Sequence, residues 1–110
     1  MDNPKFKVEK FGEILTVYLG DEPVEEWIRG VGKSILMPEL LRACESLIRG
    51  KSNTKLCAVI ISEINFKSYN YHISVKRSSI GDTLDKIMEW ALDREEYEMC
   101  ARIKKLYELL

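Results

Sequence analysis

Three cysteines and one histidine are the residues of this chain best suited to nucleophilic or metal chemistry. Cys44, Cys57 and Cys100 lie far apart in the sequence, and His72 is the single histidine. A metal site needs several converging ligands, and no Cys-x-x-Cys or His-x-x-x-His spacing is present. Each cysteine lies in an apolar stretch, where a thiolate is costly, so a Cys/His nucleophilic pair is disfavoured. We expect buried cysteines, an exposed histidine, and no catalytic residue, metal or cofactor.

A glycine-rich string, Gly30–Ser34, reads Gly-Val-Gly-Lys-Ser and copies the end of a phosphate-binding loop. The complete motif also has a glycine five residues before Gly32, and that position is Trp27 here. The string follows an expected helix and not a buried strand, so its amides would not be presented at a helix start. The sequence therefore predicts a glycine connection between two helical pieces, not a nucleotide site.

Basic and aromatic residues in the middle of the chain offer an alternative chemistry, nucleic-acid binding. The chain has a net charge of -1, but residues 35–81 carry +4. Basic grooves combined with aromatic platforms bind single strands. The stacking candidates of this alternative are Phe66, Tyr69 and Tyr71, and its phosphate-binding candidates are Lys67, Lys76 and Arg77, with Lys51 and Lys55. Against it, Tyr69 and Tyr71 share a face with Ile73 and Val75, which predicts that the tyrosines pack in the core.

The composition is that of a folded domain. Hydrophobic residues make up 45% and charged residues 32% of the 110 residues, which excludes a disordered or low-complexity chain. No apolar run reaches the ~20 residues that span a bilayer, and the N-terminus lacks a signal-peptide profile. An odd number of separated cysteines suits a reducing compartment. We expect a soluble cytoplasmic protein with no membrane contact.

The first half of the chain contains a strand pair followed by helices. Alternation over Lys5–Glu9 and the β-rich run Ile14–Leu19 predict a hairpin. A short helix is expected around Val24–Arg29, where proline and acidic residues favour a helix start. Apolar residues on one face predict a second helix over Pro38–Arg49. We expect it to start at Pro38, because the residue before a proline avoids helical dihedrals.

The second half begins with two strands. The apolar run Leu56–Ile61 predicts a buried strand at the centre of the sheet, and Tyr69–Val75 alternates as a half-buried strand. We therefore predict an α+β fold with element order ββαββαα. It has a mainly antiparallel sheet from two hairpins, a covering helix and a C-terminal helical hairpin. Residues 1–80 form the sheet core and residues 81–110 the helical hairpin of the same compact domain.

The C-terminal segment is helical by its periodicity. One apolar stripe runs from Leu84 to Ala91 and a second from Met99 to Leu110. Asp93 and Glu96 have capping-box spacing, which predicts a break near Asp93. Two helices joined by almost no loop are expected to fold back on each other as an antiparallel pair.

This segment also resembles a UVR motif, the helical hairpin found in UvrB and UvrC excision-repair proteins and in several adaptor proteins. Residues at four places carry the resemblance: Met88 with Ala91, Glu96-Tyr97-Glu98, Cys100-Ala101, and Ile103 with Leu106. The family usually continues with Leu-Arg-Asp, whereas this chain has Ile103-Lys104-Lys105. The resemblance covers about a quarter of the chain, and no helicase or nuclease motif accompanies it.

The resemblance implies an interaction module whose hairpin pairs with a second hairpin and buries its apolar seam. It implies no catalysis. The expected function is that of a non-enzymatic protein-interaction or adaptor protein, and the expected partner is a second copy or another protein with a helical hairpin. The expected contact residues are Tyr97, Cys100, Ile103, Leu106 and Tyr107. Nucleic-acid binding by the basic middle segment is the alternative.

Overall fold

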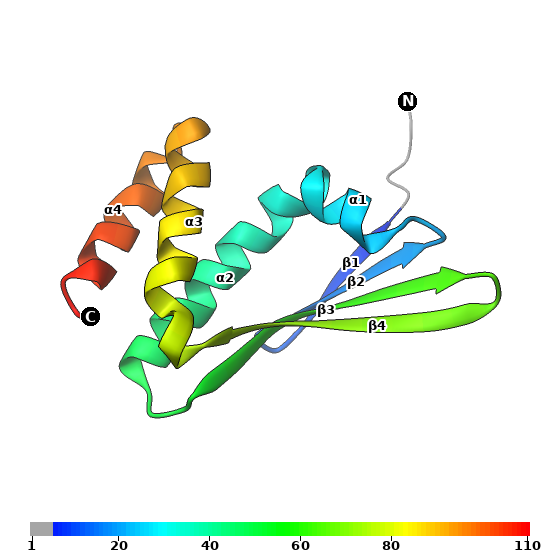
Figure 1. The fold of residues 1–110 in the computed structure, drawn as a ribbon, viewed down its shortest axis with the longest axis horizontal. Coiled ribbons are helices and arrows are strands. Elements are labelled where there is room, and N and C mark those ends of the chain that lie inside the picture. Colours follow the sequence, from blue (N-terminus) through cyan, green and yellow to red (C-terminus); the bar gives the residue numbers. More distant parts are fainter. Residues whose placement is uncertain (1–5) are drawn as a thin grey trace. The chain divides into compact units, whose positions relative to one another are not determined.

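The computed structural model describes residues 6–110, which form an α+β fold with a four-stranded mixed sheet and four α-helices (Figure 1). The strands follow the order β1-β2-β3-β4 across the sheet. The elements are β1 (Lys7–Phe11), β2 (Ile14–Gly20), α1 (Val24–Arg29), α2 (Val31–Arg49), β3 (Thr54–Ile64), β4 (Lys67–Lys76), a 3-10 turn (Arg77–Ser79), α3 (Ile80–Asp93) and α4 (Tyr97–Tyr107).

The predicted N-terminal hairpin is confirmed as the antiparallel pair β1–β2. Its register pairs Phe11 with Ile14 and Lys7 with Tyr18. The turn contains Gly12 at a φ of 61°, a left-handed conformation that glycine adopts without steric cost. The predicted start of the first strand, Lys5, lies outside the described residues.

The prediction of a mainly antiparallel sheet is wrong, because β2 and β3 are parallel. Leu15 pairs with Ala58 and Val17 with Ile60 along this central contact. The physical reason is the crossover between the two strands. Helices α1 and α2 carry the chain back to the end of the sheet at which β2 began, and a strand entered there runs parallel. β3 lies between β2 and β4, as expected for the most apolar strand.

The expected helix start at Pro38 is also wrong. Helix α2 begins at Val31 and contains Pro38 in its interior. Proline removes a single helical hydrogen bond, and nineteen residues with an apolar face outweigh that loss. The actual break is Gly30, whose amide closes α1 by donating to the carbonyls of Glu26 and Trp27 at 3.1 and 3.2 Å. Helix α1 itself has the predicted bounds. The predicted element order ββαββαα is wrong, because two α-helices follow the first strand pair and the observed order is ββααββαα.

The chain divides into two compact units, each built from separate stretches of sequence. The first comprises the chain up to Glu39 together with Leu56–Ile73, and the second comprises Leu40–Lys55 together with Ser74–Leu110. Residues 81–110 thus share a unit with the end of α2. The buried side chains of the first unit include Leu15, Val17, Leu19, Trp27, Leu36, Ala58 and Ile60, and those of the second include Leu41, Cys44, Leu47, Val75, Leu84, Ile87, Ile103 and Leu106.

In the first unit, an ion pair joins the hairpin to α2. The Lys10 ammonium lies 3.2 Å from the Glu39 carboxylate, whose side chain is only 9% exposed. Lys10 pairs with buried Leu15 across the strands, so it lies on the core face of the sheet. The contact places the middle of α2 over that face.

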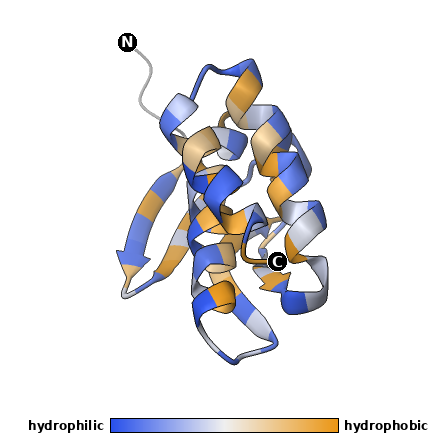
Figure 2. Cartoon of the chain, turned by 90° about the vertical axis from the view of Figure 1, so that its left-hand side faces the viewer, coloured by the Kyte–Doolittle hydropathy of each residue, from blue (hydrophilic) through white to orange (hydrophobic). Residues whose placement is uncertain are grey.

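In the second unit, α3 and α4 lie side by side as the predicted helical pair (Figure 1). Hydrophobic and hydrophilic segments alternate along the helices, as amphipathic helices require (Figure 2). Between residues 6 and 110, no helix has the length and apolar character needed to cross a membrane.

Candidate functional site

The cysteines are buried, as expected, and Cys57 is held in its neutral form. Its thiol donates a hydrogen bond to the Ile73 carbonyl at 3.3 Å. Burial and the charge of Glu39 raise the pKa of the Cys57 thiol to about 11. A nucleophilic cysteine needs the opposite shift. His72 is exposed on β4, and the described residues contain no group of three or more potential metal ligands.

The glycine-rich string 30–34 packs against an aromatic side chain. A Cβ on Gly32 would lie 2.5 Å from the Trp27 ring and from the Trp27 carbonyl oxygen. Glycine is therefore required at this position because α1 and α2 meet there. The Ser34 hydroxyl donates to the Val31 carbonyl at 2.8 Å, within the first turn of α2. These contacts explain the string without a phosphate ligand.

All five residues expected to contact a partner belong to the second unit, and three of them are buried there. Cys100 and Leu106 are 5% exposed and Ile103 is fully buried. Tyr107 is half-buried, and its hydroxyl donates to the Asp85 carboxylate at 2.5 Å, which ties α4 to α3. Desolvation and this hydrogen bond raise the pKa of Tyr107 to about 12. The apolar seam of the hairpin is therefore occupied by the chain's own residues.

An ion pair also ties α4 to α2. The Arg102 guanidinium approaches the Glu45 carboxylate to 2.5 Å, with the Glu45 side chain 17% exposed. A guanidinium that bonds both carboxylate oxygens has a fixed orientation. Lys104 and Lys105 of α4 are exposed.

Tyr97 is the one expected contact residue that is open to solvent. Its side chain is 67% exposed at the start of α4, and Leu92 at the end of α3 is 54% exposed. Both lie at the closed end of the hairpin, on either side of the connecting turn. Sequence periodicity does not identify Leu92 as a contact residue, because Leu92 lies outside the apolar stripe of α3.

The turn between them has a defined backbone. The amide of Glu96 donates to the Ala91 carbonyl at 2.8 Å and the amide of Glu95 to the Leu92 carbonyl at 3.2 Å. Glu95 has a φ of 58°. This is a Schellman cap, in which the residue after the helix is left-handed. The break near Asp93 is confirmed. Backbone hydrogen bonds close the end of α3, and no side chain caps the start of α4, so the capping box expected from Asp93 and Glu96 is not formed.

Three of the basic residues of the nucleic-acid alternative are in unlike environments. Lys67 and Lys76 are exposed at opposite ends of the ten-residue strand β4, roughly 30 Å apart at the usual rise per residue. Arg77 is committed to the fold: its guanidinium donates to the carbonyls of Leu47, Gly50 and Ser52 at 2.6, 2.9 and 2.9 Å. These contacts cap the C-terminal end of α2.

The expectation that Tyr69 and Tyr71 pack in the core is wrong. They are 44% and 37% exposed, although they alternate along β4 with the same parity as buried Val75. β4 is an edge strand, and from Lys67 to His72 every residue is exposed on both faces. The alternation of polar and apolar residues correctly puts Tyr69 and Tyr71 on the same face of β4 as Val75. It does not show over what length of the strand other residues cover that face.

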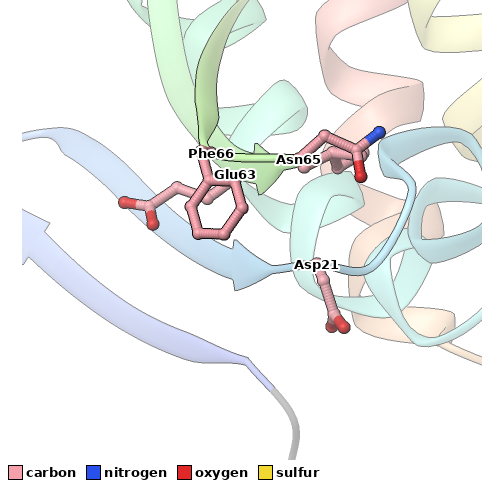
Figure 3. Close-up of a pocket in the computed structure, with 5 residues that line it drawn as sticks. Asp21, Glu63, Asn65 and Phe66 are labelled. Carbon is pink, nitrogen blue, oxygen red and sulfur yellow. The ribbon is translucent and has the colours of Figure 1, made fainter.

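The tip of the β3–β4 hairpin presents an unusual aromatic residue. The two turn residues, Asn65 and Phe66, have φ values of 53° and 64°, which suit a tight hairpin turn but not a bulky side chain. Phe66 is fully exposed. Together with Asp21, Glu63, Ile64 and Asn65 it lines a shallow pocket (Figure 3). The lining residues include two carboxylates, those of Asp21 and Glu63, which makes this tip unfavourable for phosphate groups.

Comparison with known proteins identifies no family for this chain. No protein-family model matches it, and searches of curated proteins and of solved structures find no similar protein.

Proposed function

We propose that the protein is a non-enzymatic interaction protein that binds a second helical hairpin, of another protein or of another copy, through the closed end of its α3–α4 hairpin. The observation that carries the proposal is the exposure of Leu92 and Tyr97 on either side of the turn. Exposed leucine and tyrosine side chains at one place on a rigid helical pair suit a binding surface. The resemblance to a UVR motif is part of this proposal.

The contact is assigned to the turn because the seam is occupied. Cys100, Ile103 and Leu106 support the hairpin, and Arg102 and Tyr107 hold it by polar contacts with Glu45 and Asp85. A preorganised surface binds with less loss of conformational entropy than a flexible one. The hairpin therefore acts as a fixed support for the two exposed side chains.

The test uses a photo-crosslinking amino acid in place of Tyr97, with Leu109 as the matched control position. Leu109 is 66% exposed in the same unit but lies after α4. Crosslinking to one partner from position 97 and not from 109 is the expected result. With the purified partner, the Leu92→Ala, Tyr97→Ala double variant should weaken binding at least about tenfold. Equal crosslinking from both positions, or unchanged affinity, overturns the proposal.

Ile103→Glu separates a contact role from a core role. Because Ile103 is fully buried, a glutamate there should unfold the second unit, and binding should be lost together with the helical signal in circular dichroism. Loss of binding with a native spectrum would instead place Ile103 in the interface.

A second candidate function is single-strand nucleic-acid binding on β4, favoured by the exposure of Tyr69 and Tyr71 beside Lys67. The expected signal is fluorescence anisotropy of labelled single-stranded DNA and RNA that falls steeply with salt. Tyr69→Ala and Lys67→Ala should each weaken binding. Arg77 is unsuitable as a probe, because its replacement disturbs the end of α2. No change in anisotropy at low salt eliminates this candidate.

A further inference from the structure

The two edges of the sheet differ in the way they meet solvent. β1 is five residues long and carries three charged residues in its first four positions, Lys7, Glu9 and Lys10. β4 is ten residues long, and from Ser68 to Val75 it contains no Asp, Glu, Lys, Arg, proline or glycine. Sheet edges are usually protected from other strands by short length, charge, proline or a bulge. β1 has the first two of these protections, whereas the central run of β4 is long and contains neither charged residues nor proline.

The first half of β4 is also uncovered. Every residue from Lys67 to His72 is exposed, and within residues 6–110 the strand has a sheet neighbour on one side only, β3. An uncovered edge presents backbone donors and acceptors along its length. Tyr69 and Tyr71 add exposed aromatic surface on one face of the same stretch. These features suit the addition of another strand.

We propose that β4 pairs antiparallel with β4 of a second copy of this chain, about a two-fold axis at Asn70, so that two sheets join into one. In this register Tyr69 lies opposite Tyr71 of the second copy, and the reverse pair forms by symmetry. Ser68 lies opposite His72 of the second copy, and Lys67 opposite its Ile73. Aromatic cross-strand pairs are favourable, and no like charges meet.

The second copy is favoured as occupant because the strand is complementary to itself. Its two lysines lie at its ends, so antiparallel pairing keeps them apart, and the same pairing matches both tyrosines. A nucleic acid would instead require several cations along the strand, and this stretch has only Lys67. The inference is independent of the α3–α4 surface proposed above, since it uses residues of another unit.

Disulfide trapping tests the register directly. Residues that face each other across antiparallel strands have Cα atoms about 5 Å apart, within disulfide range. Asn70→Cys should therefore link two copies on mild oxidation. Ser68→Cys is the matched control on the same face: its two copies would lie roughly 13 Å apart at ~3.3 Å per residue, too far to link. The native cysteines are buried and serve as an internal background.

Light scattering with charged variants tests the pairing without a crosslink. The native chain should be a dimer at high concentration, while Asn70→Lys and Asn70→Glu should each be monomers. At low concentration, where the native chain is also a monomer, the unfolding midpoints of all three should agree. Mixing the two variants should restore a dimer, because unlike charges then face each other. Phe11→Lys, on the exposed end of the β1 edge, should leave the dimer intact.

Four results overturn the inference. These are a native chain that stays monomeric at millimolar concentration, a dimer that persists in both Asn70 variants, a dimer abolished by Phe11→Lys, and equal crosslinking of Ser68→Cys and Asn70→Cys. A monomer that binds single-stranded oligonucleotides through Tyr69 would reassign the strand to nucleic acid.

Discussion

Arg77 is a basic side chain whose three hydrogen bonds all go to the main chain. They satisfy carbonyls at and beyond the end of α2 that have no helical partner. We expect Arg77→Ala to lower the free energy of unfolding by about 1–2 kcal/mol, because the partly buried contact to the Leu47 carbonyl is lost together with two exposed contacts. Arg77→Lys should recover little, because one ammonium does not span three acceptors. Lys76→Ala is the exposed control and should change the urea midpoint very little.

Glu95 holds a left-handed conformation that glycine adopts more easily. Glu95→Gly should raise the free energy of unfolding by up to about 1 kcal/mol, since the steric cost of a Cβ at this φ is removed. Glu95→Ala keeps the Cβ and should give no such gain. If alanine stabilises the chain as much as glycine in urea unfolding, the effect belongs to the carboxylate charge and not to the backbone.

At the scale of single residues, the sequence predicts which apolar side chains are buried better than it predicts which polar side chains form hydrogen bonds within the fold. Apolar stretches correctly predict the burial of the three cysteines. The engagement of Arg77 is hidden from local patterns, because its partners are carbonyls from a segment 25 to 30 residues earlier. The exposure of Tyr69 is hidden for another reason, since strand alternation reports direction and not coverage.

Gly32 in α2 and Gly81 in α3 differ in the contacts that an added Cβ would make. Gly32→Ala should destabilise the chain by roughly 1–3 kcal/mol, because the added Cβ meets the Trp27 ring and carbonyl where α1 and α2 join. Gly81→Ala is the matched helical control, because a Cβ at that position would have nothing within 4 Å. It should stabilise α3 by about 0.5–1 kcal/mol. Equal effects in thermal unfolding would contradict a specific packing role for Gly32.

Most elements follow from local patterns, but their pairing does not. Period-two alternation locates β1, the β-rich run Ile14–Leu19 locates β2, and the apolar run Leu56–Ile61 locates the central strand. The direction of β3 relative to β2 depends on the crossover, whose length is set by α2. Local signals predict a break at Pro38, where tertiary packing keeps the helix continuous.

For the whole molecule, stability should fall in alkaline solution. Cys57 and Tyr107 have pKa values raised from 9.0 and 10.0 to about 11 and about 12. Above pH 9 the unfolded chain therefore releases protons that the folded chain retains, and the free energy of unfolding decreases until the folded groups ionise. Urea unfolding across this range measures the slope. Cys57→Ala and Tyr107→Phe should each flatten it, and an unchanged slope in both variants would contradict the assignment.

The chain passes between its two compact units three times, after Glu39, after Lys55 and after Ile73. During synthesis from the N-terminus, the β1–β2 hairpin therefore emerges long before β3, the strand that completes its inner edge. Until then Leu15 and Val17 have no sheet partner on that side, and the growing chain carries an exposed apolar edge. Each unit is built from two separate stretches of sequence, so recombination at a single point cannot transfer either unit whole. The two units must therefore be inherited together.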